Sequence, residues 1–249
     1  MSYKIENRGL IKKKRFLIPV ILTLGIFGTR AALIASGDTT GPKTVPAAVA
    51  KASKKPVEAP ELTAYRMQID NYIRRKNRNV GPAERKRLID AILKNAPRVL
   101  RHRGMRIDGQ AVDPVLFVTA FIKVESTFYR RATSHSGARG YMQLMPRTFV
   151  WMAKKHGQRL SPAVLYQTGP NVYWGVSYIN MLIRMMPNPR LVTLAYNAGP
   201  NNVKRGVYRP SYWRSVSASY RELKRGRPAY VRYARRQLQQ AGQTQLASK

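Results

Sequence analysis

Two segments after residue 60 carry hydrophobic residues at helical spacing. In the first, 61–78, the apolar positions are Leu62, Tyr65, Ile69, Tyr72 and Ile73. The second begins at Pro82, a residue suited to the first turn of a helix, and continues until Pro97 interrupts it. Because intervals of three and four residues place side chains on one helical face, we expect two amphipathic helices that pack on the remainder of the chain.

The rest of the chain is also helical in pattern, with polar, glycine-containing connections. Asp113-Pro114 combines an N-cap residue with proline at the first helical position, and predicts a helix from 113 to about 128. Further helices are expected near 146–156, at 171–186 and at 191–198. No segment sustains the alternation of a strand, so the predicted fold is mainly α.

The N-terminal segment 1–37 has the pattern of a secretory signal. Four basic residues at 12–15 precede an apolar run from Phe16 to Thr29, and small residues follow. The run of 14 residues is shorter than the roughly 20 that span a bilayer as a helix. A cleaved signal peptide is therefore favoured over a retained membrane anchor, in which Arg30 would snorkel to the interface. Both alternatives place the rest of the chain outside the cytoplasm.

Composition divides the chain after residue 37 into four parts. Residues 38–60 are rich in Pro, Ala, Lys and Thr without apolar periodicity, which is typical of a flexible linker. Residues 61–109 hold the two amphipathic helices and form an N-terminal helical extension. Residues 110–240 form the main helical domain, and residues 241–249 form a polar tail.

The chain is strongly basic. Of its 249 residues 46 are Lys or Arg and 11 are Asp or Glu, giving a formal net charge of +35 that is spread along the sequence. Such a surface attracts a polyanion: nucleic acid, an anionic membrane surface or an acidic wall polymer. Carboxylates are scarce after residue 109, where the three acids are Asp113, Glu125 and Glu222.

Composition also excludes several classes of protein. Hydrophobic residues make up 44% of the chain, which is enough for a folded core. The chain has no cysteine, which excludes disulfides, cysteine-ligated metals and a thiol nucleophile. Because it has three histidines and no HExxH spacing, we expect no metal site, and no organic cofactor is implied.

Glu125 is the acid whose position points to chemistry. On the predicted helix it lies on the same face as Phe121 and Ile122, so it interrupts an apolar stripe near the helix end. Burial there raises the pKa of a carboxyl and keeps it protonated near neutral pH, as a general acid requires. The alternative is a structural glutamate that pairs with Arg130 or Arg131.

Four blocks between residues 125 and 231 follow one another in a characteristic order. They are Glu125-Ser126 with Gly137-Ala138-Arg139-Gly140 and Met142-Gln143-Leu144-Met145-Pro146, then Pro170-Asn171-Val172, then Ala195-Tyr196-Asn197-Ala198-Gly199, and finally Tyr230-Val231. Over about residues 110–236 the chain resembles the soluble lytic transglycosylase family of the lysozyme-like superfamily. The resemblance leaves 61–109 unassigned, and 211–228 departs from the family's usual approach to the late tyrosine.

The resemblance implies a lysozyme-like transglycosylase domain at 110–240, with Glu125 as its catalytic acid. Tyr230 matches the late tyrosine that approaches this acid, and the alternative is one more aromatic residue among 14 tyrosines. The other substrate-binding residues that the resemblance implies are Ser126, Gly140, Met142, Gln143, Tyr196 and Asn197.

Side-chain chemistry suggests how some of these residues act. Met142 can pack against a sugar face, and Gln143 can hydrogen-bond an acetamido group. Gly140 allows the backbone to approach a sugar closely and permits a positive φ. Met145 and Tyr178 are expected to be ordinary core residues.

A single acid suits the reaction that the resemblance implies. Ordinary glycosidases place two carboxylates about 5–10 Å apart, but the next acids lie 12 residues before Glu125 and 97 after it. In a lytic transglycosylase the acid protonates the bond between N-acetylmuramic acid and N-acetylglucosamine, and the substrate's acetamido group replaces the second carboxylate. The muramyl 6-hydroxyl then closes a 1,6-anhydro ring without water.

Two alternative functions stay open. One is a muramidase that uses water, as lysozymes do, and the other is a wall-binding assembly factor for a secretion apparatus or flagellum with weak activity. The expected partner is peptidoglycan, in the periplasm or envelope of a bacterium, with envelope assembly machinery as a further partner and membrane contact only through 1–37. Nucleic acid is not expected, because the chain has an export signal and no nucleic-acid-binding motif.

Overall fold

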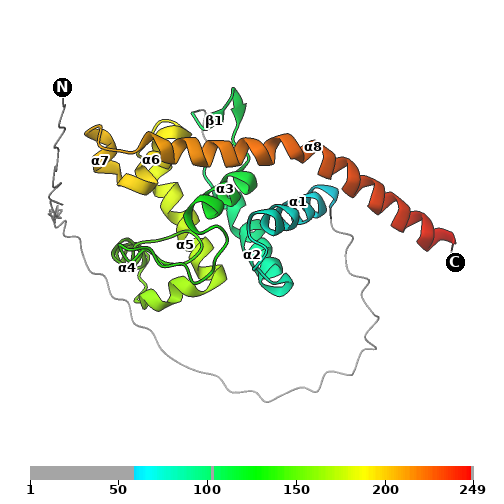
Figure 1. The fold of residues 1–249 in the computed structure, drawn as a ribbon, viewed down its shortest axis with the longest axis horizontal. Coiled ribbons are helices and arrows are strands. Elements are labelled where there is room, and N and C mark those ends of the chain that lie inside the picture. The colour runs from blue at the N-terminus through cyan, green and yellow to red at the C-terminus, as the bar shows by residue number, and fades with distance from the viewer. Residues whose placement is uncertain (1–58, 102–103, 248–249) are drawn as a thin grey trace, which may run out of the picture. The chain divides into compact units, whose positions relative to one another are not determined.

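The computed structural model describes residues 59–101 and 104–247, so the expected signal segment 1–37 and nearly all of the linker 38–60 lie outside the described residues. The described elements are almost all helical, which confirms the prediction of a mainly α fold (Figure 1). In chain order they are α1 (Pro60–Lys76), α2 (Pro82–Asn95), η1 (Ala96–Arg98), β1 (Arg106–Ile107), β2 (Gln110–Ala111), α3 (Pro114–Ser126), α4 (Pro146–Lys155), η2 (Pro162–Tyr166), α5 (Thr168–Ile183), α6 (Pro189–Ala198), α7 (Pro200–Lys204) and α8 (Pro210–Ala247).

Proline is the first residue of most of these helices, including α1, α2, α3, α4 and α6. Its fixed φ and missing N–H suit the first helical turn, where that N–H would have no helical partner. At α3 the preceding Asp113 also caps the helix, since its Oδ1 accepts hydrogen bonds from the amides of Val115 (3.0 Å) and Leu116 (3.2 Å). The predicted helix start at 113–114 is confirmed.

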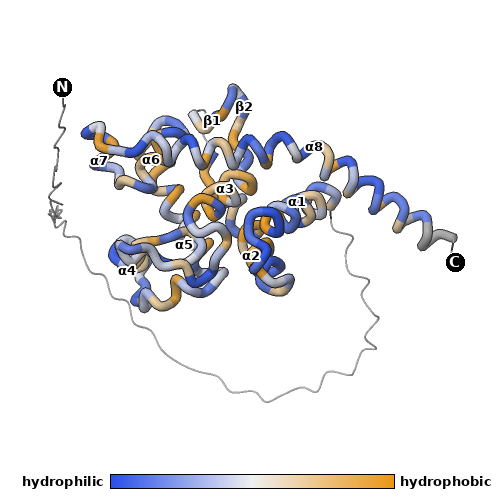
Figure 2. Tube along the Cα trace, viewed as in Figure 1, coloured by the Kyte–Doolittle hydropathy of each residue, from blue (hydrophilic) through white to orange (hydrophobic). Residues whose placement is uncertain are grey.

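Helix α3 lies at the centre of the described unit and is mostly apolar (Figure 2). Its residues 114–122 are all buried. Phe117 packs edge-on against Phe121, at 5.0 Å between ring centroids, and against Tyr220 of α8, at 6.2 Å. Burial on every side for more than two turns makes α3 a rigid support for the residues at its C-terminal end.

The two helices predicted before residue 109 pack directly on this core. Helix α1 buries Ile69, Tyr72 and Ile73, and the ring of Tyr72 meets Phe128 edge-on at 5.9 Å. Helix α2 buries Leu88 and packs against α5. Both helices therefore belong to the same hydrophobic core as α3.

Helix α8 is the longest element and was not anticipated as one continuous helix. It runs across α3 and then along α1 (Figure 1). Pro228 lies inside it and removes one backbone hydrogen bond without ending the helix. Its last turns are polar and extend to Ala247, into the segment predicted to be a polar tail. Within the described residues, no helix is both long enough and apolar enough to cross a membrane.

A small hairpin is the exception to the helical pattern. Strands β1 and β2 pair antiparallel, with Arg106 opposite Ala111, and the turn between them is Asp108-Gly109 at φ values of 50° and 74°. An Asp-Gly pair with both φ angles positive is the preferred two-residue hairpin turn. Strands of two residues are too short to show alternation, which is why the hydrophobic pattern did not predict them.

Candidate active site

Glu125 lies in the last turn of α3, where the apolar core meets the surface. Its side chain is partly buried, and its Oε1 accepts a hydrogen bond from the phenol of Tyr212 in α8. The ring of Phe121, one turn earlier, packs against Tyr212 at 6.5 Å and against Tyr196 of α6 at 4.9 Å. Three helices therefore surround the carboxyl with aromatic side chains.

Burial raises the pKa of Glu125 to about 7, and the hydrogen bond from Tyr212 partly opposes that rise. A carboxyl with a pKa near 7 is partly protonated at neutral pH, so it can donate a proton and later accept one. The alternative interpretation, a structural Glu125 that pairs with Arg130 or Arg131, is not observed. Instead Arg130 donates to the carbonyl of Tyr166 at 3.1 Å.

The helix ends immediately after Glu125 in an unusual backbone conformation. Thr127 and Phe128 have φ values of 48° and 62°, in the left-handed region that non-glycine residues rarely adopt. Two such residues in succession cost conformational energy, and the surrounding packing holds them in place. The Phe128 ring is buried against Tyr72, and the Thr127 carbonyl accepts a hydrogen bond of 2.8 Å from the Asn77 side chain.

The prediction that Tyr230 is the tyrosine beside Glu125 is wrong in this structure. Tyr212, at the start of α8, makes that hydrogen bond, and Tyr230 lies 18 residues further along the same helix. At a rise of 1.5 Å per residue, that separation is about 27 Å. Instead, the side chains of Tyr230 and of Gln68 in α1 both lie close to Gly226.

The glycine-containing loop at 139–144 is anchored by Asn171 of α5. This fully buried side chain donates to the carbonyls of Arg139 (3.0 Å) and Leu165 (2.8 Å), and accepts from the amide of Met142 (2.8 Å). Gly140 has φ 75°, and a Cβ there would collide with Asn171 and with the Leu165 carbonyl. Glycine is required at 140 for both conformation and space.

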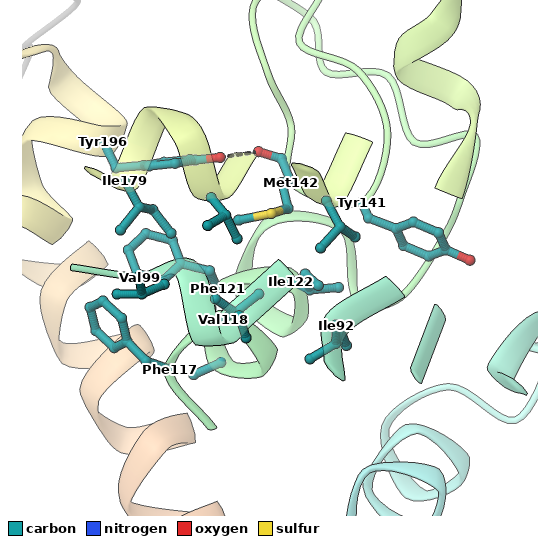
Figure 3. Packing of buried hydrophobic residues seen from close by; sticks show 14 of the residues in the cluster. Ile92, Val99, Phe117, Val118, Phe121, Ile122, Tyr141, Met142, Ile179 and Tyr196 are labelled. Carbon is teal, nitrogen blue, oxygen red and sulfur yellow. Dashed lines mark hydrogen bonds between the residues drawn. The ribbon is translucent and has the colours of Figure 1, made fainter. Parts of the chain in front are cut away.

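Met142 and Gln143 act in the loop differently from the prediction. The Met142 side chain is fully buried and contacts Gly175, so the interpretation of it as a sugar-contacting group is wrong. Figure 3 shows its sulfur directed into the apolar cluster, while its carbonyl accepts a 2.7 Å hydrogen bond from the Tyr196 phenol. The side-chain Nε2 of Gln143 donates to the carbonyls of Ala132 (3.0 Å) and Gly140 (2.8 Å), so it braces the loop.

The remaining predicted residues divide between surface and core. Asn197 is exposed at the end of α6, and the Ser126 hydroxyl donates to the Ile122 carbonyl at 3.1 Å within α3. Met145, predicted to be a core residue, is 39% exposed, so that prediction is wrong. Tyr178 is partly buried against Tyr196, at 5.1 Å between ring centroids.

The other acids near the core all have separate partners. Asp113 caps α3 and accepts a hydrogen bond of 2.7 Å from Tyr65. Asp108 pairs with Arg221 at 2.7 Å, and Glu222 pairs with Lys76 at 3.0 Å. No second carboxylate contributes to the raised pKa of Glu125, and the described residues contain no cluster of three or more potential metal ligands.

Two residues of this site, Tyr212 and Asn171, were not singled out from the sequence. Tyr212 lies in the segment 211–228, where the sequence departs from the expected pattern. Asn171 carries a sequence signal beyond its place in the block Pro170-Asn171-Val172: it is an asparagine at the start of a strongly apolar helix, where a buried amide requires several hydrogen-bond partners.

Comparison with known proteins identifies the same part of the chain. Residues 105–212 match the family described as transglycosylase SLT domain. A stretch of 97 residues is 34% identical to an inferred soluble lytic murein transglycosylase of Haemophilus influenzae, covering 38% of this chain and 16% of that protein. A stretch of 94 residues is 32% identical to the soluble lytic murein transglycosylase of Escherichia coli K12, covering 36% and 15%.

Two solved structures align with part of this chain at low identity. Lytic transglycosylase Slt from Pseudomonas aeruginosa, solved as an inactive mutant, aligns with 60% of this chain and 24% of its own, at 23% identity and a TM-score of 0.39. The 70 kDa soluble lytic transglycosylase of Escherichia coli aligns over the same shares at 25% identity and a TM-score of 0.38. The chain thus spans a small part of the length of each of these relatives.

Proposed function

We propose that this chain, whose residues 105–212 match the transglycosylase SLT domain family, is a lytic transglycosylase that cleaves the glycan strands of peptidoglycan. One observation supports this proposal most strongly. The acid that the family pattern makes catalytic, Glu125, is partly buried among aromatic rings, hydrogen-bonded by Tyr212, and has a pKa near 7.

Among the described residues no second carboxylate acts on Glu125, which favours substrate-assisted chemistry. The described acids near the core pair with Arg221, with Lys76, or with the N-terminus of α3. A reaction with one carboxylate needs another internal nucleophile, and the 2-acetamido group of N-acetylmuramic acid supplies it. Peptidoglycan carries this group on every sugar, which makes it a suitable substrate.

In the proposed reaction Glu125 acts first as acid and then as base. It protonates the oxygen between N-acetylmuramic acid and N-acetylglucosamine while the acetamido carbonyl attacks the anomeric carbon. The Glu125 carboxylate then takes the proton of the muramyl 6-hydroxyl, which displaces the acetamido oxygen and closes the 1,6-anhydro ring. The pKa near 7 suits both steps, because neither protonation state is strongly disfavoured at neutral pH.

The loop at 139–144 and the end of α6 supply the neighbouring groups for the substrate. The Tyr196 phenol joins them by its hydrogen bond to the Met142 carbonyl, which fixes the loop backbone relative to the aromatic wall beside Glu125 (Figure 3). Exposed Asn197 is the group we assign to sugar contact. The prediction that Gly140 lets the backbone approach a sugar is wrong, because Gly140 is buried against Asn171 and the Leu165 carbonyl. The buried Met142 side chain takes no part.

The basic surface fits an acidic polymer as substrate. The net charge of +35 attracts the carboxylates of peptidoglycan stem peptides and concentrates the protein on the wall. We also propose export to the periplasm or cell envelope, on the basis of the signal pattern in residues 1–37.

The test is the product released from purified murein sacculi. Mass spectrometry that detects 1,6-anhydromuropeptides would support the proposal. Products with a reducing-end muramic acid would identify a muramidase instead, and sacculi that bind the protein without any product would indicate a wall-binding factor.

A further inference from the structure

We propose that helices α1 and α2 are a positioning element of the active site. In this proposal Asn77 holds the C-terminal end of α3, and Glu84 holds the loop at 139–144. This inference rests on the proposed function and extends it to residues outside the matched family segment 105–212. The two helices touch the site at separate places, and each contact can be tested by a single substitution.

The first contact is at the C-terminal end of α3. The Asn77 side chain, just past the end of α1, donates a 2.8 Å hydrogen bond to the Thr127 carbonyl. Thr127 lies two residues beyond Glu125 and has the left-handed φ of 48°. An unusual backbone conformation persists only where its surroundings enforce it, and Asn77 supplies a directional bond at this residue.

The same helix also holds the other end of α3. The Tyr65 phenol of α1 donates a 2.7 Å hydrogen bond to Asp113, the N-cap of α3. With Tyr72 packed on Phe128 as well, α1 contacts α3 at its first and last turns. Helix α1 therefore limits the sliding and tilting of α3 that would move the Glu125 carboxyl relative to Tyr212.

The second contact is between α2 and the loop at 139–144. Glu84, in the first turn of α2, accepts hydrogen bonds from the phenol of Tyr141 and from the hydroxyl of Thr168 at 3.2 Å. Tyr141 is fully buried and immediately precedes Met142, whose carbonyl binds Tyr196. In Figure 3 the Tyr141 ring extends away from Met142, so the two residues hold the loop from different sides.

Glu84 keeps its charge in this position. Burial acts to raise the pKa of its carboxyl, but the hydrogen bonds from Tyr141 and Arg87 outweigh burial and lower the pKa below its ordinary value. Arg87 lies 2.7 Å away and Arg130 3.7 Å away. Arg130 also donates to the Tyr166 carbonyl at 3.1 Å, so the Glu84 cluster joins α2 to the segment that follows α3.

The experiment compares two variants of the full chain with matched controls. Asn77→Ala is paired with Asn79→Ala, which changes the same turn two residues away. Glu84→Gln is paired with Lys86→Gln, which removes a charge from the same helix at an exposed side chain that pairs with Asp90 at 3.0 Å. Each protein is assayed for kcat and KM on sacculi and for melting temperature, and the Glu125 carboxyl is titrated by ¹³C NMR.

We expect Asn77→Ala to lower kcat about 10-fold with little change in KM, because misplacement of a catalytic group lowers reactivity more than binding. In this variant the pKa of Glu125 should fall toward its ordinary value, because water gains access to the carboxyl. Glu84→Gln raises KM about 3-fold or more with a smaller effect on kcat, because the loop loses its fixed position. Both controls keep wild-type kinetics and Glu125 pKa.

If Asn77→Ala has the same kcat, KM and Glu125 pKa as Asn79→Ala, the proposed role of Asn77 is overturned. If Asn77→Ala fails to fold, Asn77→Asp replaces it, since this variant keeps an acceptor for the Asn79 amide while removing the donor to Thr127. A wild-type protein that releases no product contradicts the proposed function, and the NMR titration still decides whether Asn77 positions Glu125.

Discussion

The phenol of Tyr212 donates a hydrogen bond to the carboxyl of Glu125 across 87 residues of sequence. This pair joins the end of α3 to the beginning of α8, and it is the one hydrogen bond that modifies the pKa of Glu125. The identity and protonation of these two groups therefore determine several measurable properties of the protein.

Glu125→Gln should abolish the acid function while keeping the shape of the side chain. An amide cannot deliver a proton to the glycosidic oxygen, so we expect turnover to fall by about 100-fold or more. Binding to sacculi should persist, which a pull-down assay measures beside the release of soluble muropeptides. Turnover near the wild-type rate would remove Glu125 from the mechanism.

Tyr212→Phe should move the pH profile of turnover. The Tyr212 hydrogen bond lowers the pKa of Glu125, so its loss raises that pKa further above 7. Because the acid must be protonated, the wild-type rate should fall as pH rises through about 7, and in the variant this fall should occur at higher pH. Tyr230→Phe is the control and should leave the profile unchanged. If Tyr230→Phe shifts the pH profile and Tyr212→Phe does not, Tyr230 is the tyrosine that supports Glu125, as the sequence predicted.

The raised pKa of Glu125 also predicts a dependence of stability on pH. The unfolded carboxyl has a pKa of 4.5 and the folded one about 7, so the folded state binds more protons between these values and loses stability as pH rises through them. Glu125→Gln cannot ionise, so its melting temperature should exceed that of the wild type at pH 8 by more than at pH 4. Allowing for partial exposure, we expect the stabilisation of Glu125→Gln relative to the wild type, measured as free energy of unfolding, to be roughly 1–3 kcal/mol larger at pH 8 than at pH 4. Equal differences at both pH values would contradict the raised pKa.

Two glycine substitutions should separate backbone strain from collision. Gly137 has φ 86° with open space around its Cα, so Gly137→Ala should cost about 1 kcal/mol of unfolding free energy from strain alone. Gly140→Ala adds a collision with Asn171 and the Leu165 carbonyl, and should cost about 3 kcal/mol or more. Chemical denaturation measures both. Equal costs would show that the loop relaxes around a Cβ at 140.

Attraction to the wall should depend strongly on salt. The Debye length falls from about 10 Å at 0.1 M to about 3 Å at 1 M, so binding of the +35 chain to sacculi should weaken over that range. Turnover of a short uncharged glycan should change far less, because hydrogen bonds and packing in the site are short-ranged. Equal salt sensitivity of the two substrates would place the basic residues inside the site.

Local pattern was sufficient to predict the elements that carry the site. Asp113-Pro114 predicted the start of α3, and the apolar stripe ending at Glu125 predicted its partly buried carboxyl. Both signals lie within a few residues of the feature that they predict, since capping and helical periodicity are local.

The partner of Glu125 could not be found in the same way. The choice of Tyr212 over Tyr230 depends on where α8 crosses α3, which is set by packing between segments about 90 residues apart. Met142 was misassigned for a related reason: a loop sequence does not show which side chain faces the core, and the space beside Gly175 determines this only once α5 is in place. Long-range packing of this kind leaves no periodic trace in the chain.

The pairing of the first helix with the last has a consequence for folding kinetics. Gln68 donates to the Leu223 carbonyl at 2.6 Å across 155 residues, and Arg227 binds Glu61 at 2.6 Å across 166 residues. Contacts of such high sequence separation form late and raise the contact order, which slows folding. During synthesis α1 cannot acquire its partner until residues beyond 223 have left the ribosome. Until then α1 lacks the helix that it packs against, so the part of the chain that has already been synthesised stays incompletely folded.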